Sequence, residues 1–287
     1  MPKDKNIGLI IGCNYNGTTH TLNGCINDTK LLKNTIPRKM GISSKNLYIM
    51  TDYSKDNMYP TRDNIISELN KIITRINNEH INEFWFSFSG HGSYITDRNN
   101  DERDGRDECI IPLRYKKGII SDDDLLKIFS KITYPNCKVI CLFDCCHSGT
   151  IMDLEYNYKR LYHKSIWRRA WVKVRYSWIL SRKKTKPYWK WHVSKDSVKN
   201  TLKCQVVCIS GCFDNSTSAD VYWNKKKEWG GALTNGFISL VNDDLNNLSC
   251  LDICDGLNKY MKKIGQSQKP VISSNYPINK NTKLLNV

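Results

Sequence analysis

The chain has 287 residues, 40% of them hydrophobic, and a formal net charge of +16 at pH 7. This length suits one large α/β domain or two smaller ones. No stretch approaches the roughly 18 consecutive apolar residues of a membrane-spanning helix, and the N-terminus lacks the body and cleavage site of a signal peptide. We therefore expect an intracellular, cytoplasmic protein. Its twelve cysteines are expected to be mostly reduced core residues, because disulfide frameworks belong to short secreted chains.

The positive charge is concentrated in residues 158–203. This segment contains fifteen Lys or Arg residues and one acid, Asp196, so it carries +14, whereas the rest of the chain carries only +2. The basic character therefore describes one segment and says little about the partners of the whole chain.

Apolar runs and capping residues predict strands that alternate with helices. Strands are expected at 5–12, 47–50, 83–88, 109–113, 138–143 and 205–210, and helices at 27–36, from 61 to 76, after Ser121, near 231–241 and near 251–264. The first of these helices is expected to stop before Pro37. Strand and helix alternation of this kind favours an α/β fold with a mostly parallel sheet covered on both faces.

Two polar clusters follow two of the buried strands. His91 lies between Gly90 and Gly92, and Cys146 follows Asp144. Reactive groups of parallel sheets lie in loops beyond the carboxyl ends of strands. A His that takes the proton of a thiol makes that thiol a useful nucleophile, so Cys146 and His91 are candidates for a peptidase dyad, with backbone N–H groups of Gly92 and Cys146 as an oxyanion hole.

Two neighbouring residues are less suited to this chemistry. His147 follows Cys146 directly, and successive residues that leave a strand point in different directions, so it is a poor base for that thiol. Cys145 is interpreted as a packing residue. Spacing alone does not establish contact between His91 and Cys146, so a buried cysteine and an ordinary loop histidine remain an open alternative.

The amino-acid sequences of these two clusters resemble motifs of a known protein family. FSFSGHG at 86–92 and LFDCCHSGT at 142–150 are similar to the two catalytic motifs of metacaspases, caspase relatives that cleave after Arg or Lys. Further similar segments lie at 22–29, 107–112, 118–125 and 210–220, so the resemblance covers about residues 5–245, in the family's order.

The resemblance implies a caspase-like three-layer α/β/α sandwich. The chain is similar to a type I metacaspase without an N-terminal prodomain, with a large catalytic region at 1–157, a basic linker at 158–203 and a small region at 204–287. Together these would form one caspase-like domain, and the family implies a monomer.

The resemblance also implies roles for individual acids. Asp28 and Asp144, with Ser89 nearby, would line a pocket for the basic P1 side chain of a polypeptide substrate, which suits two carboxylates. The alternative is that each acid caps a helix or a loop. Calcium would be held by four acids, and no organic cofactor is expected. These four residues are Asp107, Asp122, Asp123 and Asp153. The alternative for residues 121–124 is a helix start that needs no metal.

The basic segment admits several interpretations. In many metacaspases this region is cut autocatalytically after Lys or Arg, and a basic side chain of the linker would also fit the acidic pocket in cis. The segment has five tryptophans, and Trp167, Trp171 and Trp178 fall at helical spacing, so one face of a helix would pack on the domain or cover the active site. Basic residues mixed with aromatic residues also suit an anionic membrane or nucleic acid, so a caspase-fold scaffold that binds such a surface is the alternative function.

Overall fold

The computed structural model describes most of the chain. The described residues are 5–96, 106–146, 151–152, 154–163, 167–174, 177–184, 188–195, 201–212, 220–224, 227–244 and 248–285. No helix in these ranges is long and apolar enough to cross a membrane.

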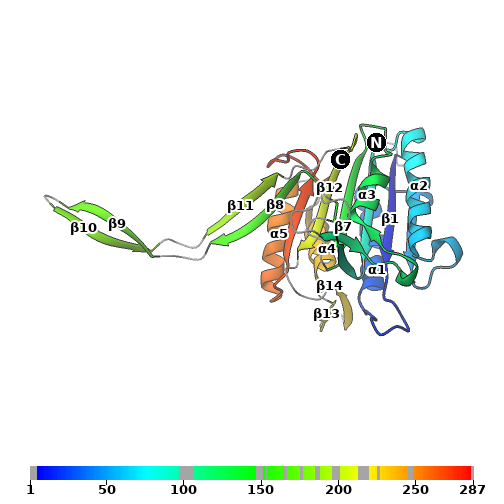
Figure 1. Ribbon diagram of the computed structural model, residues 1–287, viewed down its shortest axis with the longest axis horizontal. Coiled ribbons are helices and arrows are strands. Elements are labelled where there is room, and N and C mark those ends of the chain that lie inside the picture. Colours follow the sequence, from blue (N-terminus) through cyan, green and yellow to red (C-terminus); the bar gives the residue numbers. More distant parts are fainter. Residues whose placement is uncertain are drawn as a thin grey trace.

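A central sheet of eight strands runs through the molecule in the order β11-β8-β15-β12-β7-β3-β1-β2 (Figure 1). Five neighbouring strands are parallel, and three strands at one side are antiparallel. The parallel strands are β1 (Asn6–Gly12), β2 (Leu47–Thr51), β3 (Glu83–Ser89), β7 (Lys138–Asp144) and β12 (Gln205–Cys212). The antiparallel strands are β15 (Lys269–Ser274), β8 (Tyr156–His163) and β11 (Tyr188–Lys195).

Five helices cover the two faces of this sheet. Helices α2 (Arg62–Glu79) and α3 (Asp122–Phe129) pack on one face, and α1 (Cys25–Met40), α4 (Ala232–Asp244) and α5 (Cys250–Lys263) pack on the other. Strand alternation divides the side chains between two cores, so Phe84 and Phe86 of β3 belong to the first core and Trp85 to the second. The prediction of a caspase-like three-layer α/β/α sandwich is confirmed.

Smaller elements surround the carboxyl ends of the parallel strands and the antiparallel edge. A three-stranded sheet contains β4 (Gly92–Thr96), β5 (Arg106–Ile110) and β6 (Ile120–Ser121), and two hairpins contain β13 (Asp220–Trp223) with β14 (Glu228–Gly231) and β9 (Trp167–Val174) with β10 (Ser177–Lys184). Short 3-10 helices lie at Ser44–Asn46, Asp56–Met58 and Tyr115–Lys117.

The ends of α1 and α2 show how well local signals predict boundaries. Thr61 caps α2 as expected, because its side chain accepts a hydrogen bond from the backbone N–H of Asn64. The predicted end of α1 before Pro37 is wrong. The helix continues to Met40, where burial of Ile36 and Met40 against the second core offsets the missing proline donor, and Gly41 then ends the helix in a left-handed conformation.

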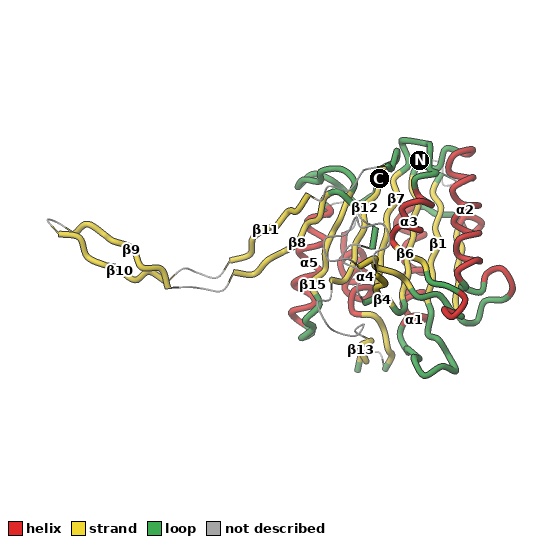
Figure 2. The backbone as a smooth tube through the Cα atoms, viewed as in Figure 1, coloured by secondary structure: helices red, strands yellow, loops and turns green. Residues whose placement is uncertain are grey.

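The basic segment contains strands where helical spacing of the tryptophans indicated a helix. Trp167 and Trp171 lie on β9, and Trp178 lies on the antiparallel partner β10. These two strands extend far from the helices of the body (Figures 1 and 2), so the expectation that this part packs on the domain or covers the active site is also wrong. Aromatic and β-branched residues favour pleated strands, and the ladder between β9 and β10 pairs the backbone groups that the two strands turn toward each other.

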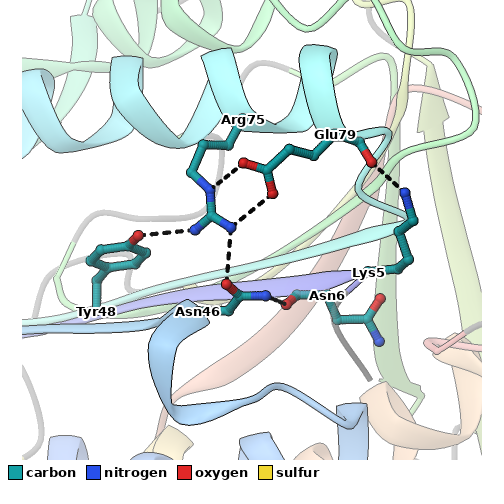
Figure 3. Close-up of polar contacts among 6 residues, drawn as sticks. All are labelled: Lys5, Asn6, Asn46, Tyr48, Arg75 and Glu79. Carbon is teal, nitrogen blue, oxygen red and sulfur yellow. Dashed lines mark hydrogen bonds and ion pairs between the residues drawn. The ribbon is translucent and has the colours of Figure 1, made fainter. Parts of the chain in front are cut away.

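Arg75 ties the end of α2 to the edge of the sheet (Figure 3). Its guanidinium donates to both carboxylate oxygens of Glu79 at 2.8 Å, to the Tyr48 hydroxyl at 3.0 Å and to the Asn46 side-chain oxygen at 3.0 Å. The Asn46 amide donates in turn to the backbone oxygen of Asn6 at 3.2 Å. The guanidinium lowers the pKa of the Glu79 carboxyl. This network fixes α2 against β1 and β2, on the side of the molecule away from the β9–β10 hairpin (Figure 1).

Candidate active site

The two polar clusters leave adjacent strands at the same edge of the sheet. Strands β3 and β7 are parallel neighbours in a register that places Ser89 beside Asp144. The backbone N–H of Gly90 donates to the backbone oxygen of Asp144 at 3.3 Å. The chain turns away from the sheet after each of these two strands. His91 and Cys146 each lie two residues beyond a strand end, so they sit on neighbouring loops.

Tyr15 and His20 hold His91 in place. The imidazole Nε2 lies 2.7 Å from the backbone oxygen of His20, and the ring of Tyr15 lies 4.7 Å from the imidazole between centroids. The backbone N–H of His91 donates to the Tyr15 hydroxyl at 2.8 Å, and that hydroxyl donates to the backbone oxygen of Ile111. Burial raises the pKa of the Tyr15 phenol well above its usual value, so the phenol keeps the proton that this donation needs.

Glycine at position 92 allows the two loops to touch. A Cβ atom on Gly92 would lie 1.9 Å from the backbone oxygen of Cys146 and 3.3 Å from Sγ of Cys145. No side chain fits in that space, so the backbone after His91 packs directly on the backbone of Cys146. Cys145 is buried in the first core, which confirms its role as a packing residue. His147 lies outside the described residues.

Asp28 and Asp144 converge on the start of α4. The backbone N–H of Gly231 donates to both carboxylate oxygens of Asp28 at 2.9 and 3.1 Å, and the backbone N–H of Thr234 donates to Oδ2 of Asp144 at 2.7 Å. A Cβ atom on Gly231 would lie 2.1 Å from Oδ2 of Asp144 and 2.7 Å from Oδ2 of Asp28. The two oxygens are therefore within about 5 Å of each other, a distance at which like charges repel and a cation between them is favoured.

In addition to their predicted role in binding substrate, both acids therefore accept hydrogen bonds from the backbone that stabilise the fold. Asp28 lies in the first turn of α1 and Asp144 at the end of β7, yet their carboxylates bind backbone donors beside the first turn of α4. Asp28 lies in the first turn of α1, as the capping alternative expected, and both acids also accept hydrogen bonds from the start of α4. Ser89, the third predicted pocket residue, is buried and lies beside Asp144 in the strand register.

The β13–β14 hairpin adjoins this pair of acids and was not anticipated from the sequence. The side-chain amide of Asn27 donates to the backbone oxygen of Trp229 at 2.9 Å. A Cβ atom on Gly230 would lie 3.4 Å from Oδ1 of Asp28. The rings of Tyr222 and Trp229 lie 5.3 Å apart and are 45% and 41% exposed, so an exposed aromatic pair adjoins the acids.

Three of the four acids predicted to bind calcium lie on α3 or the adjacent β5, on the face of the sheet that α2 and α3 cover. Asp107 on β5 and Asp122 at the start of α3 are buried, and the backbone N–H of Glu108 donates to Oδ2 of Asp122 at 2.7 Å. Burial raises the pKa of Asp122 to about 8; backbone donors oppose this shift, and the charges of Asp107 and Glu108 add to it. Asp123 and Asp107 line a cavity of about 800 Å³.

This donor set suits a hard cation, since carboxylates that repel one another are relieved by positive charge. Among the described residues, no three His, Cys, Asp or Glu side chains are already gathered as a metal site. Asp153, the fourth predicted ligand, lies outside the described residues. Asp124 binds Arg62 at 2.9 Å, and Ser121 caps α3 by accepting from the N–H of Asp124 at 3.2 Å, so the predicted helix start is confirmed.

Sequence comparison shows the family. Residues 7–155, just over half of the chain, match the family model described as metacaspase, peptidase C14 domain. The chain belongs to the metacaspase family. It is therefore a cysteine-type endopeptidase by family, and the dyad loops described above lie within the matched residues.

Similar proteins support this membership over nearly the full chain. The chain is 31% identical to Metacaspase-1 of Yarrowia lipolytica, over 98% of this chain and 64% of that protein. It is also 31% identical to Metacaspase-1 of Meyerozyma guilliermondii, over 96% of this chain and 71% of that one. The crystal structure of protein GSU0716 from Geobacter sulfurreducens has a similar fold, with a TM-score of 0.61 and 20% identity over 99% of this chain and 100% of that chain.

Two parts of this metacaspase site were not predicted from the sequence, the contacts that hold His91 and the β13–β14 hairpin. Tyr15 and the backbone oxygen of His20 precede the first matched motif and contact His91 from a loop whose conformation only the fold defines. A backbone oxygen carries no residue preference, so no sequence signal was available for His20. The β13–β14 hairpin had a signal in the aromatic and β-branched residues that are typical of strands, but each of its runs is only four residues long.

Proposed function

We propose that this chain cleaves polypeptides after Arg or Lys, with Cys146 as the nucleophile and His91 as its acid/base partner. The observation that carries the specificity is the convergence of Asp28 and Asp144 on Gly231. A guanidinium or ammonium leaving water needs compensating charge, and two nearby carboxylates supply it with bidentate geometry available to Arg. Each chain contains both acids and the dyad, so we propose that it acts as a monomer.

The proposed reaction begins at the imidazole. A carbonyl can only accept a hydrogen bond, so the contact with the His20 oxygen requires the proton on Nε2 and leaves the Nδ1 lone pair to take the thiol proton. The thiolate of Cys146 attacks the scissile carbonyl, whose oxygen becomes negative and is stabilised by the backbone N–H groups of Gly92 and Cys146. The imidazolium then protonates the leaving amine, and water hydrolyses the thioester with His91 as base.

Calcium stimulation is the second part of the proposal. Asp107, Asp122, Asp123 and Asp153 would hold the ion, and calcium would supply charge compensation for acids that repel one another in the folded chain. Support comes from the buried, like-charged neighbours Asp107 and Asp122. The contact from Glu108 to Asp122 links this region to β5, whose partner β4 begins at Gly92. Ordering of this region would therefore affect the position of the backbone next to His91.

Autoprocessing in the basic segment is the third part. Residues in the β8–β11 and β9–β10 ladders have their backbones paired, and a peptidase needs an unpaired extended segment. We therefore place cleavage, and any occupancy of the acid pair in cis, at basic residues between or after these strands. The candidates are Lys164, Arg175, Lys186, Lys199 and Lys203; the first four lie outside the described residues, and Lys203 is exposed between β11 and β12.

Free thiols favour a reducing compartment. All eleven cysteines whose side chains are described are buried thiols outside any disulfide. Burial raises the pKa of several of them, to about 12 for Cys109 and Cys204, so Cys109 and Cys204 remain unreactive thiols. We propose a cytoplasmic location on this basis.

The test is cleavage of matched peptides that carry Arg, Lys or Asp at P1, with calcium or with a chelator. Wild-type protein should cleave the Arg and Lys peptides and leave the Asp peptide intact, and Cys146→Ala should be inactive. Cleavage that survives in Cys146→Ala, or equal cleavage after Asp, would contradict the proposal. Activity unchanged by the chelator would remove only the calcium part.

A further inference from the structure

The basic segment forms a two-part β arm. At its base, β8 pairs with β15 of the central sheet from Tyr156 to Lys159 and with β11 along its whole length. Beyond this lies the β9–β10 hairpin, which is well separated from every helix of the body in Figures 1 and 2. The arm is therefore built onto the fold at one end and carries its other end away from the active site.

The ladder register divides the hairpin into two halves with different chemistry. The four rungs nearest the turn pair Trp171 with Leu180, Val172 with Ile179, Lys173 with Trp178 and Val174 with Ser177. Six of these eight residues are apolar and one is charged. The four rungs nearer the body pair Trp167 with Lys184, Arg168 with Lys183, Arg169 with Arg182 and Ala170 with Ser181, so five of these eight residues are cations.

We propose that this hairpin docks on anionic lipid bilayers, with the apolar half entering the interface and the cationic half binding lipid headgroups. Four rungs of antiparallel strand span about 10 Å, which matches the depth of about 5–10 Å to which interfacial elements bury their apolar surface. Tryptophan favours this level of a bilayer. An eight-residue strand whose mainly apolar half is four rungs long is too short to span the hydrocarbon core, so the hairpin lies at the interface.

The separation of apolar and basic rungs favours lipid over nucleic acid as the partner. Binding to a phosphate backbone rewards cations along the whole contact surface, and it gives no reason for an apolar end. A bilayer has the same two layers as the hairpin, first anionic headgroups and then hydrocarbon. This activity is additional to the proposed peptidase activity and uses neither the dyad nor the acid pair, although it shares the basic segment in which autoprocessing is proposed.

The test uses full-length protein carrying Cys146→Ala, to prevent self-cleavage, and vesicles of phosphatidylcholine with or without phosphatidylserine. Three double variants are compared with this parent. The basic-rung variant is Arg169→Ser with Arg182→Ser, the apolar-rung variant is Trp171→Ser with Trp178→Ser, and the control is Lys33→Ser with Lys280→Ser, which removes the same charge from exposed positions on the body. Equal thermal unfolding midpoints establish that each variant is folded.

The parent should bind phosphatidylserine vesicles, more weakly as salt rises, and should not bind vesicles of phosphatidylcholine alone. The basic-rung variant should bind about 30-fold more weakly, while the control stays within about threefold. The apolar-rung variant should bind roughly tenfold more weakly and lose the blue shift of tryptophan emission on vesicle addition. The proposal is overturned if phosphatidylserine vesicles do not bind, if the control weakens binding as much as the basic-rung variant, or if duplex DNA binds more tightly than the vesicles.

Discussion

Nε2 of His91 lies 2.7 Å from the backbone oxygen of His20. Because the contact uses a backbone atom, His20→Ala should keep kcat/KM within about threefold of wild type, whereas His91→Ala should lower it by about a thousandfold or more. Steady-state hydrolysis of an Arg peptide measures both. A loss in His20→Ala comparable to that in His91→Ala would mean that the His20 side chain, and not its carbonyl, serves the reaction.

Gly92 provides a second test of the dyad geometry. A methyl group at this position would meet the backbone oxygen of Cys146 at 1.9 Å, so Gly92→Ala must displace either the nucleophile loop or the start of β4. We expect kcat/KM to fall about 100-fold, because displacements of this size disturb the alignment of reacting atoms. Ser93→Ala, one residue further along β4, is the control and should retain activity. Full activity in Gly92→Ala would show that the two loops need not touch.

Gly231 lies against both pocket acids. Gly231→Ala would bring a methyl group within 2.1 Å of Asp144 Oδ2 and 2.7 Å of Asp28 Oδ2, and should raise KM for Arg peptides more than it lowers kcat. Stability should fall by about 1–3 kcal/mol, as expected for overpacking a buried site. Urea unfolding and steady-state kinetics measure the two effects. The exposed Glu228→Ala in the same hairpin is the control, and an equal rise of KM in that variant would mean that the hairpin as a whole, and not Gly231, matters.

The raised pKa of Asp122 leads us to expect that stability depends on pH when a chelator is present. Burial raises its pKa to about 8 in the folded protein, well above about 3.9 for an unfolded Asp. Between these values the folded state binds more protons than the unfolded state, so this residue makes the free energy of unfolding fall as pH rises, until it levels off above about pH 8. Asp122→Asn should therefore show a flatter decline of melting temperature between about pH 5 and pH 8. Parallel curves for the two proteins would contradict this titration.

The sequence predicted the layers of the fold well and the basic arm poorly. Runs of buried residues, as in β3, and capping residues, such as Thr61, are local signals. The alternation of strands and helices could therefore be predicted from the sequence. Trp167, Trp171 and Trp178 fit a helical period by chance, and strand pairing across a turn decided their structure instead. The helix end at Pro37 was misplaced because tertiary burial of Met40 outweighed a local preference.

The candidate site was predictable where side chains carry the chemistry. Four of the predicted residues belong to motifs with specific sequences, namely Cys146, His91, Asp28 and Asp144. Strands β3 and β7 are neighbours in the register that brings the His91 and Cys146 motifs together. The supports of His91 were not predictable, since one is a carbonyl oxygen and the other, Tyr15, reads as an ordinary aromatic residue. The pairing of both acids with the start of α4 depends on contacts between distant parts of the chain.

In the proposed function, two carboxylates recognise the charge of the P1 side chain. The most direct measurement compares kcat/KM for one peptide with Arg at P1 and for the same peptide with citrulline, a neutral side chain of nearly the same shape. We predict a preference for Arg of about 100-fold or more in the wild type, reduced about tenfold in Asp28→Asn, because citrulline would leave the acids uncompensated. Equal cleavage of the two peptides by the wild type would show that Asp28 and Asp144 do not recognise the P1 charge.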